Sequence, residues 1–338
     1  MAKTAFITGA GGEVGFTLVH DLKKRGYRII ASSLHDLEPE LKKNVDEFYA
    51  INISDKKSLS GVFEKHNFDV IFHLASILST GGEKNPELAI EANTIGSINM
   101  LELAAEQTLK RKKSVIFIFP STIAAYGLPD LATKKRAGSV KEGEFSHPIT
   151  IYGVTKIFTE NLGVYFSEHY RLLDNLSESE RIDFRCVKYP GLLSPDTLPS
   201  GGTSDYGSEM IHNAVQGKDF ECFVRPDTKI PFMAMEDAVR AIITLSETPK
   251  NKLKHRVYNI SGFSVSAEEI AKEVISLFPG TKITYQSHGT RQGIVDSWPE
   301  DIDDSKAKED WGWEPKYTFK KTFEEYLLPK IKERYKVK

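Results

Sequence analysis

Tyr152 and Lys156 are four residues apart, and the pair Ser121-Thr122 precedes them by about thirty residues. On a helix this spacing places both side chains on one face, so that an ammonium group lies beside a phenol. A free phenol has a pKa of about 10, and lowering it to 7 requires roughly 4 kcal/mol of differential stabilisation of the phenolate. A cation about 5 Å away supplies roughly 3 kcal/mol, and a second positive charge, such as an oxidised nicotinamide ring, could supply the rest. The trio therefore predicts a tyrosine that takes the proton of an alcohol.

The tyrosine-lysine spacing alone does not establish a site. Two further pairs, Tyr317/Lys321 and Tyr326/Lys330, have the same spacing near the C-terminus, and nothing around them resembles a site. The context of Tyr152 must therefore decide.

The N-terminal residues predict an element that could hold a cofactor. An apolar strand over 3–8 is followed by Gly9, Gly12 and Gly15 and then by an apolar-periodic helix over 14–24. Glycines between a strand and a helix allow a tight turn and let a pyrophosphate approach the positive end of the helix. The alternative is a glycine-rich turn without a ligand.

The end of the second strand bears on the choice between NAD and NADP. An acidic residue is expected there, because it would bind the ribose hydroxyls and exclude a 2′-phosphate. Ser33 occupies that position, the nearest acid is Asp36, and no arginine adjoins Ser33. The residues themselves leave the choice open.

The pattern of elements predicts a doubly wound α/β fold. Short apolar strands alternate with helical patterns, which indicates a parallel sheet of Rossmann type with helices on both faces. Further strands are expected at 27–32, 48–53, 70–74, 115–120 and 184–189, with a helix over 88–107 and another that carries Tyr152. The polar stretch 171–181 is expected to be a surface insertion.

Beyond residue 190 the composition changes, and Pro, Gly and Ser concentrate over 194–202. We expect a dinucleotide-binding domain over 1–187 and a smaller α/β substrate lobe over 188–338, with 229–260 returning to the first domain. In the second part the pattern predicts helices over 236–245 and 267–277, a strand over 282–285, a polar loop over 286–299 and a final helix from about residue 320.

Composition excludes several classes of function. With 338 residues and 40% hydrophobic content the chain can build a large core, and a net charge of −2 gives no footprint for nucleic acid or an anionic membrane. Cys186 and Cys222 lie in separate apolar stretches without the spacing of a zinc site, so no metal is expected. No apolar run is long enough to span a bilayer, which predicts a soluble, cytoplasmic protein.

The glycine turn, Ser121-Thr122 and the tyrosine-lysine pair occur in the order and spacing of the extended short-chain dehydrogenase/reductase superfamily, and the N-terminal two thirds resembles it. The resemblance implies that Thr122 positions the substrate oxygen, Tyr152 exchanges the proton, and Lys156 tunes Tyr152 while binding the nicotinamide ribose. Thr122 lies four residues before Tyr126-Gly127, where the family's hydroxyl residue is usual. His73 is expected to be a satisfied core or supporting histidine rather than a base.

The second half is similar to the short-chain type of L-threonine 3-dehydrogenase. The segments that carry this resemblance are 189–193, 201–206, 220–223, 296–299, 302–305 and 310–313, with 73–79 and 82–86 earlier in the chain. Departures are Ser33 where an acid is usual, the longer insertion at 172–181, and Ser204 where a second threonine is common. The resemblance implies oxidation of L-threonine to L-2-amino-3-oxobutanoate with NAD as hydride acceptor, in a homodimer that pairs helices at 88–107 and 155–169.

The resemblance also implies which residues contact the ligands. Thr203 and Ser204 could hold the substrate carboxylate, Asp205 could organise their loop, and Trp298 could cover the pocket. The expected substrate contacts are Ser79, Thr122, Tyr152, Thr203, Ser204 and Trp298. The expected cofactor contacts are Gly9, Gly12, Glu13, Val14, Gly15, Ser33, Asn52, Ile53, Leu74, Ala75, Ser76, Asn93, Tyr152, Lys156 and Tyr189.

Two other functions remain open. A nucleotide-sugar epimerase or dehydratase shares the catalytic trio, but it must hold a diphosphate, and the chain has few arginines beyond residue 189. A dinucleotide-sensing protein without catalysis would not need Thr122, Tyr152 and Lys156 together.

Overall fold

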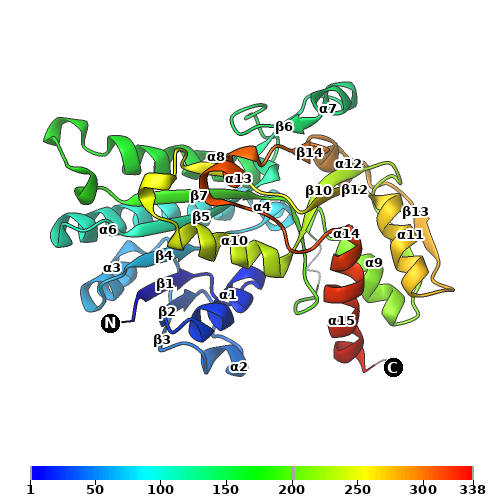
Figure 1. The fold of residues 1–338 in the computed structure, drawn as a ribbon, viewed down its shortest axis with the longest axis horizontal. Coiled ribbons are helices and arrows are strands. Elements are labelled where there is room, and N and C mark those ends of the chain that lie inside the picture. The colour runs from blue at the N-terminus through cyan, green and yellow to red at the C-terminus, as the bar shows by residue number, and fades with distance from the viewer. Residues whose placement is uncertain (1, 199–201, 337–338) are drawn as a thin grey trace.

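The computed structural model describes residues 2–198 and 202–336. Within these stretches, seven strands form one sheet in the order β11-β7-β5-β4-β1-β2-β3, and all neighbouring pairs are parallel (Figure 1). Its strands are β1 (Thr4–Thr8), β2 (Arg28–Ser33), β3 (Glu47–Ala50), β4 (Val70–His73), β5 (Ile116–Thr122), β7 (Asp183–Tyr189) and β11 (Val257–Asn259). The expected Rossmann-type sheet is confirmed.

Both faces of this sheet are covered because successive strand residues point to opposite sides. Ala5 and Ile7 of β1 belong to one core cluster, and Phe6 between them belongs to the other. Helices α1 (Glu13–Lys24) and α10 (Met235–Glu247) pack together in the first cluster, while α3 (Lys56–Lys65) and α6 (Gly96–Arg111) pack together in the second. Helix α10, at the position of the helix expected over 236–245, therefore packs against elements of the first part of the chain.

Smaller sheets build the second part of the molecule. Strand β10 (Lys229–Ala234) pairs in parallel with β8 (Gly191–Leu193) and antiparallel with β12 (Phe263–Ser266). Two short parallel pairs are β9 (Phe220–Cys222) with β13 (Ile283–Tyr285), and β6 (Ser139–Val140) with β14 (Asp301–Ile302). Because β10 joins this part and β11 joins the large sheet, the division of the chain at residue 187 stays a prediction.

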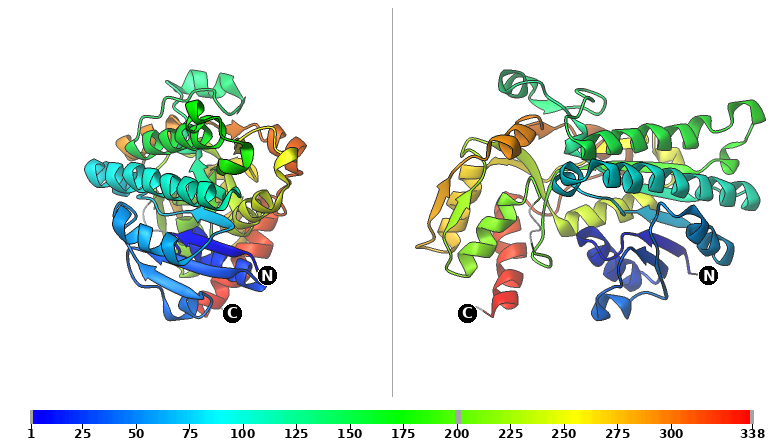
Figure 2. Two further views of the ribbon diagram at one scale, coloured as in Figure 1. Left: turned by 90° about the vertical axis from the view of Figure 1, so that its left-hand side faces the viewer. Right: turned by 180° about the vertical axis from the view of Figure 1, so that it is seen from behind.

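The other α-helices of the described residues lie between and after these strands. They are α2 (Pro39–Lys42), α4 (Ser79–Lys84), α5 (Pro86–Ile90), α7 (Leu131–Ala137), α8 (Ile151–Val164), α9 (Tyr206–Val215), α11 (Ala267–Leu277), α12 (Gly289–Asp296), α13 (Ser305–Trp311), α14 (Phe319–Lys321) and α15 (Leu328–Tyr335). Three π-helical turns, over 91–95, 165–169 and 322–327, continue α5, α8 and α14. Helices α6 and α8 run side by side in both views of Figure 2.

One expectation about the elements was wrong. The expected polar loop over 286–299 contains α12, because His288 caps Arg291 N and the buried Gln292 contacts Thr228, which compensates for a polar sequence with poor helix propensity. The expected helix over 88–107 is confirmed: α5, a π turn and α6 follow one another without a break from Pro86 to Arg111. The helix over 267–277 and the exposed insertion near 171–181 were predicted correctly.

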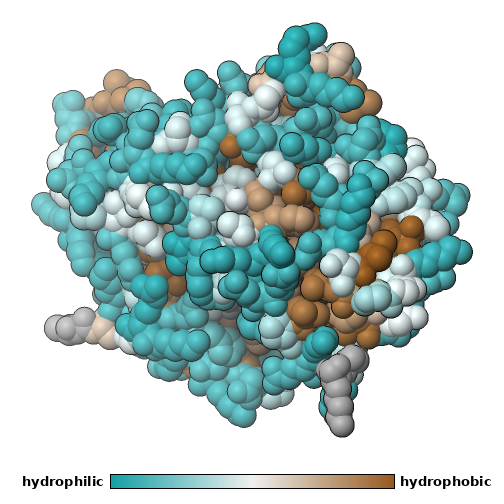
Figure 3. Space-filling model, turned by 45° about the vertical axis from the view of Figure 1, so that its right-hand side comes forward, coloured by the Kyte–Doolittle hydropathy of each residue, from teal (hydrophilic) through white to brown (hydrophobic). Residues whose placement is uncertain are grey.

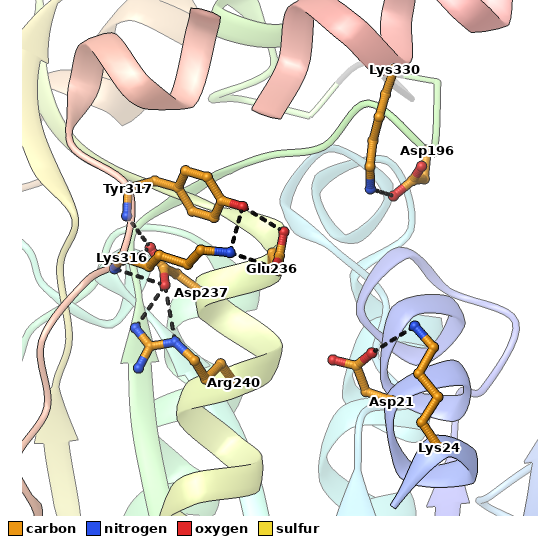
Figure 4. Close-up of polar contacts among 9 residues, drawn as sticks. All are labelled: Asp21, Lys24, Asp196, Glu236, Asp237, Arg240, Lys316, Tyr317 and Lys330. Carbon is orange, nitrogen blue, oxygen red and sulfur yellow. Dashed lines mark hydrogen bonds and ion pairs between the residues drawn. The ribbon is translucent and has the colours of Figure 1, made fainter. Parts of the chain in front are cut away.

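Polar contacts bind the C-terminal segment to α10 (Figure 4). Asp237 is 1% exposed and accepts hydrogen bonds from Lys316 N, Tyr317 N and the Arg240 guanidinium. Glu236 accepts from the Tyr317 hydroxyl at 2.8 Å, and both acids lie in the first turn of α10, where the helix dipole favours negative charge. On the face shown in Figure 3, hydrophilic residues cover most of the surface and apolar residues gather in separate patches on the side of the C-terminal helices.

No helix within the described ranges is both long and apolar enough to cross a membrane. Both cysteines are free and buried in strands β7 and β9, as expected.

Candidate active site

The structure brings the three expected catalytic residues into one cavity. Thr122 is the last residue of β5, and Tyr152 and Lys156 lie on α8, whose first turn is capped by the Thr150 hydroxyl. Gly153 allows α8 to approach the end of β5 closely, because a Cβ there would lie 2.0 Å from Ala124 O. The Lys156 Nζ is 5.5 Å from the centroid of the Tyr152 ring, and Tyr152 shares a hydrogen bond with Thr122.

The pKa values of this pair differ from the expectation that Lys156 lowers the pKa of Tyr152. Burial raises the pKa of Tyr152 well above its usual value, and the hydrogen bond to Thr122 opposes this rise only in part. Burial also lowers the pKa of Lys156 to about 8. Lys156 donates to Pro120 O at 2.9 Å and lies 4.5 Å from the centroid of the Phe119 ring. In the protein alone Lys156 therefore does not lower the pKa of Tyr152 towards 7, and a further positive charge is needed.

The other tyrosine-lysine pairs lie elsewhere. Tyr317 and Tyr326 are not among the residues that line the cavity, and the Tyr317 hydroxyl is bound to Glu236. His73 bridges Thr8 and Ser97 through its two ring nitrogens at 2.8 and 3.0 Å, and burial lowers its pKa to about 3. It is a neutral core histidine, as expected.

The glycine turn fits a dinucleotide pyrophosphate. Gly9 has φ +68°, and a Cβ on it would lie 2.6 Å from Ala75 N. A Cβ on Gly15 would lie 2.6 Å from Ala10 O, so that α1 begins close to the strand. Among the described residues no side chain caps α1 at Gly12, which leaves the amides of its first turn for an anion. Burial raises the pKa of Glu13 beside these amides, and Asp205 adds to the effect.

The expected cofactor residues divide into two groups. Those that line the cavity are Gly9, Gly12, Glu13, Val14, Gly15, Leu74, Ser76, Tyr152, Lys156 and Tyr189. Those outside its lining in the described chain are Ser33, Asn52, Ile53, Ala75 and Asn93. Ser33 still adjoins the turn, since a Cβ on Gly11 would lie 3.4 Å from its Oγ.

The side chain of Asn93 binds protein groups rather than facing the cavity. Its Oδ1 accepts from Ile77 N at 2.7 Å, and its Nδ2 donates to Ile77 O and to Thr155 Oγ1. It therefore joins the segment after β4 to α8. Asp36 forms an exposed ion pair with Lys42 at 2.8 Å.

The expected substrate residues all line the same cavity, whose volume is about 260 Å³. Thr203 Oγ1 and Ser79 Oγ are 3.0 Å apart, so the loop that carries the Thr203 and Ser204 hydroxyls, called the hydroxyl loop, contacts the N-terminus of α4. Asp205 Oδ2 accepts from Gly202 N at 2.6 Å and closes the turn that presents Thr203 and Ser204. Gly201, the first residue of the segment 201–206, lies outside the described residues.

Trp298 reaches the cavity from the end of α12. It is 5% exposed, and its backbone N donates to Val295 O at 3.1 Å. Arg225 binds Asp296 through two hydrogen bonds of 2.8 and 2.9 Å, and the buried Lys134 donates to Val295 O at 3.0 Å. The position of Trp298 therefore depends on a helix that the sequence interpretation missed.

Other residues of the site were also missed. Glu160, one helical turn after Lys156, is buried with Lys188, and its spacing of four from Lys156 was a signal in the sequence. Further cavity residues not singled out are Leu78, Pro120, Ile123, Ala124, Pro190, Gly191, Leu192 and Gly202. Most of these are small or apolar residues, whose side-chain type carries little information about function.

Comparisons with known proteins show a family and relatives to which this chain is similar. The family model described as "NAD dependent epimerase/dehydratase family" matches residues 5–261. The mitochondrial L-threonine 3-dehydrogenase of Bos taurus is 37% identical over 316 residues, which cover 91% of this chain and 77% of that protein.

Two solved structures are similar over nearly the full length. The holo form of an L-threonine dehydrogenase from Cupriavidus necator has a TM-score of 0.85 and 34% identity, covering 96% of this chain and 99% of that one. A monomeric L-threonine 3-dehydrogenase from a metagenome, in its apo form, has a TM-score of 0.84 and 35% identity over 97% of this chain and 99% of that one. With its parallel sheet and glycine turn, this chain belongs to the NAD dependent epimerase/dehydratase family and is a nicotinamide-dinucleotide-dependent oxidoreductase.

Proposed function

We propose that the protein oxidises L-threonine at its side-chain alcohol to L-2-amino-3-oxobutanoate, with NAD as hydride acceptor. The observation that carries this proposal is a single small cavity in which Thr122, Tyr152 and Lys156 face the hydroxyl loop at Thr203-Ser204. Such a cavity offers polar groups for a small zwitterion at one end and an alcohol-activating trio at the other. The similarity to L-threonine 3-dehydrogenases supports the same substrate.

In this proposal Thr122 holds the substrate oxygen and Tyr152 takes the hydroxyl proton. A bound NAD would supply the hydride acceptor and a positive charge near the phenol. The amides at the start of α1 would bind the pyrophosphate, and Lys156 would bind the ribose. Burial raises the pKa of Tyr152 and so makes the phenolate costly to form. The positive charge of bound NAD would lower this cost at the moment of reaction.

The hydroxyls of Thr203 and Ser204 would hold the substrate carboxylate, and Trp298 would exclude water from the far side. Thr203 is 3% exposed and Trp298 is 5% exposed, so both lie in a part of the cavity that is screened from bulk solvent. Hydrogen bonds to a charged group in such a cavity are stronger than the same bonds in water.

A nucleotide-sugar substrate fits the site less well. From residue 189 on, the arginines that could hold a diphosphate are Arg225, Arg240, Arg256, Arg291 and Arg334. Within the described chain none of them lines the cavity, and each contacts another protein group, for example Asp296 for Arg225 and Asp237 for Arg240. A diphosphate in this lobe would therefore lack a ready cationic partner.

The experiment that tests the proposal follows absorbance at 340 nm with purified protein, L-threonine and each oxidised cofactor. We expect NADH to form with NAD and a lower kcat/KM with NADP, because no arginine adjoins Ser33. UDP-glucose should remain unchanged in a parallel incubation. Conversion of UDP-glucose to another UDP-hexose, with threonine inert, would overturn the assignment.

A homodimer is a second part of the proposal. Exposed apolar side chains follow one face of the adjacent helices α5–α6 and α8: Leu88 at 46%, Ile95 at 44%, Val154 at 45%, Phe158 at 37% and Tyr165 at 42%. Two helices that leave such a face open can bury it against the same face of a second copy around a two-fold axis.

The cytoplasmic location also stays a prediction.

A further inference from the structure

A buried charged cluster lies directly behind the catalytic trio. Glu160 is 4% exposed and Lys188 is 1% exposed, and the Lys188 Nζ lies 2.7 Å from each of the two carboxylate oxygens of Glu160. The Ser121 hydroxyl donates to the same carboxylate. The cluster thus connects α8, the end of β5 and the end of β7.

Each member of the cluster adjoins a residue of the proposed active site. Glu160 follows Lys156 by one helical turn, Ser121 precedes Thr122, and Lys188 precedes Tyr189. Lys156 also donates to Pro120 O, the carbonyl before Ser121. A change at Glu160 would therefore reach Thr122 through Ser121, and Lys156 through helix α8 and through the strand end at Pro120.

The charges around Lys156 are few. On α8 the centroid of the Tyr152 ring lies 5.5 Å from the Lys156 ammonium, and Glu160 follows Lys156 by one helical turn. Cys186 on β7 and His73 on β4 also act on Lys156, whereas Lys188 is the ion-pair partner of Glu160. Burial raises the pKa of the Cys186 thiol and lowers that of His73, so both are neutral near pH 7. The carboxylate of Glu160 is the negative charge that can favour the Lys156 ammonium, and its ion pair with Lys188 offsets part of that effect.

We propose that Glu160 is a positioning residue for this site: its carboxylate, shared with Lys188 and Ser121, keeps the Lys156 ammonium in place beside Tyr152 and fixes the strand end that carries Thr122. The role of Lys156 in this sentence rests on the proposed function. Two buried ammonium groups without a carboxylate between them would carry an uncompensated desolvation cost. One of them would lose its proton or move towards water.

The test is a titration of the lysine side chains in the protein without ligands, followed by NMR with ¹³C at the ε carbon. The Lys156 signal is assigned by its loss in Lys156→Met. We expect Glu160→Gln to lower the Lys156 pKa by about one unit, because an opposite charge is lost at nearly constant shape. We expect Lys188→Met to raise it by about one unit, because a like charge is lost.

Opposite signs for these two variants separate a charge effect from simple loss of packing. If Glu160→Gln does not fold, the double variant Glu160→Gln/Lys188→Met removes both charges, and its Lys156 pKa should lie below that of Lys188→Met alone. The matched control is Asp183→Asn, which removes a carboxylate from another buried ion pair on β7, with Arg185, and should leave the Lys156 pKa unchanged. Shifts of the same sign in both single variants, or no shift in either, would overturn the proposal.

A second readout is the pH dependence of NADH binding, measured by fluorescence. Affinity should weaken with rising pH at a lower midpoint in Glu160→Gln than in the unchanged protein, with about a tenfold difference at pH 9. Failure of threonine oxidation would count against the proposed substrate, but it would leave the NMR titration unaffected.

Discussion

Among the tyrosines of the chain, Tyr152 is the one whose phenol lies in the cavity beside a threonine hydroxyl and a lysine. Burial makes it a weak acid in the protein alone, so its use as a base depends on charge that arrives with the cofactor. The same four-residue spacing at Tyr326 and Lys330 leads to a buried tyrosine outside the cavity. At the residue scale, environment rather than spacing distinguishes the two.

We expect Tyr152→Phe to lower kcat by at least about 100-fold, because a positioned acid or base contributes roughly 10² to 10⁴ in rate. NADH affinity and Tm should change little, since only a hydroxyl is removed. The matched control is Tyr326→Phe, which deletes the hydroxyl of another tyrosine with a lysine four residues later and should retain kcat. Near-normal turnover in Tyr152→Phe would place the base elsewhere.

The pH profile follows from the same groups. Tyr152 must lose its proton and burial raises its pKa, so kcat should rise with pH by up to tenfold per unit through the neutral range. The rise should stop as Lys156, whose pKa is about 8 in the protein alone, loses its charge. Steady-state kcat from pH 6 to 9 tests this, and a flat profile across that range would contradict it.

At the scale of elements, substrate selection depends on the loop at Gly202–Asp205 and on helix α12. Removing a hydrogen bond to a charged group costs about 1.5 to 3 kcal/mol, so Thr203→Ala or Ser204→Ala should lower kcat/KM for threonine by roughly 10-fold to 150-fold. Trp298→Ala should also lower kcat, because water would enter the cavity. Thr281→Ala, in another loop of the same lobe, serves as the control.

Kinetics with threonine and binding of NADH should be measured for all four variants. Loss of threonine use with intact NADH binding is the expected pattern. Unchanged kinetics in the first three would show that these segments are structural, and the threonine assignment would lose its local support.

Helix α10 holds the C-terminal segment through one buried carboxylate (Figure 4). Asp237→Asn places an amide NH₂ against other donors in either orientation, because Oδ2 accepts from Lys316 N and Tyr317 N, and Oδ1 accepts from Lys316 N and Arg240. At least one hydrogen bond to a charged group is therefore lost. We expect a loss of about 2 kcal/mol, seen as a Tm lower by roughly 4 °C. Asp227→Asn, which weakens an exposed ion pair with Arg225, should shift Tm much less, and equal shifts would contradict the argument.

At the scale of the whole molecule, the open question is whether the apolar face of α5–α6 and α8 meets a second copy. A similar protein is described as monomeric, so the fold alone does not decide. We expect a dimer by sedimentation velocity, and Phe158→Glu should convert it to a monomer because a charge would be buried at the interface. Ile275→Glu, at a similarly exposed apolar residue on α11, should leave the mass unchanged. A monomer before any substitution would refute the dimer.

The sequence by itself indicated the parallel sheet, the glycine turn and the placement of Tyr152 and Lys156 on one helical face, whereas the choice of Thr122 came from the family resemblance. These features follow from local rules: apolar periodicity sets strands and helices, glycines mark the turn, and a spacing of four places two side chains on one helical face. For the same reason the helix over 267–277 was predicted at its observed bounds.

Only the tertiary structure decided which polar residues meet. Helix α12 exists because Gln292 and Asp296 find partners at Thr228 and Arg225, more than sixty residues earlier, and no local pattern reports such contacts. Burial, which sets the pKa of Tyr152, Lys156 and His73, is likewise a property of the packed molecule. The ion pair of Glu160 with Lys188 joins a helix to a strand across 28 residues, and the long-range fold alone brings these two charges together behind the catalytic trio.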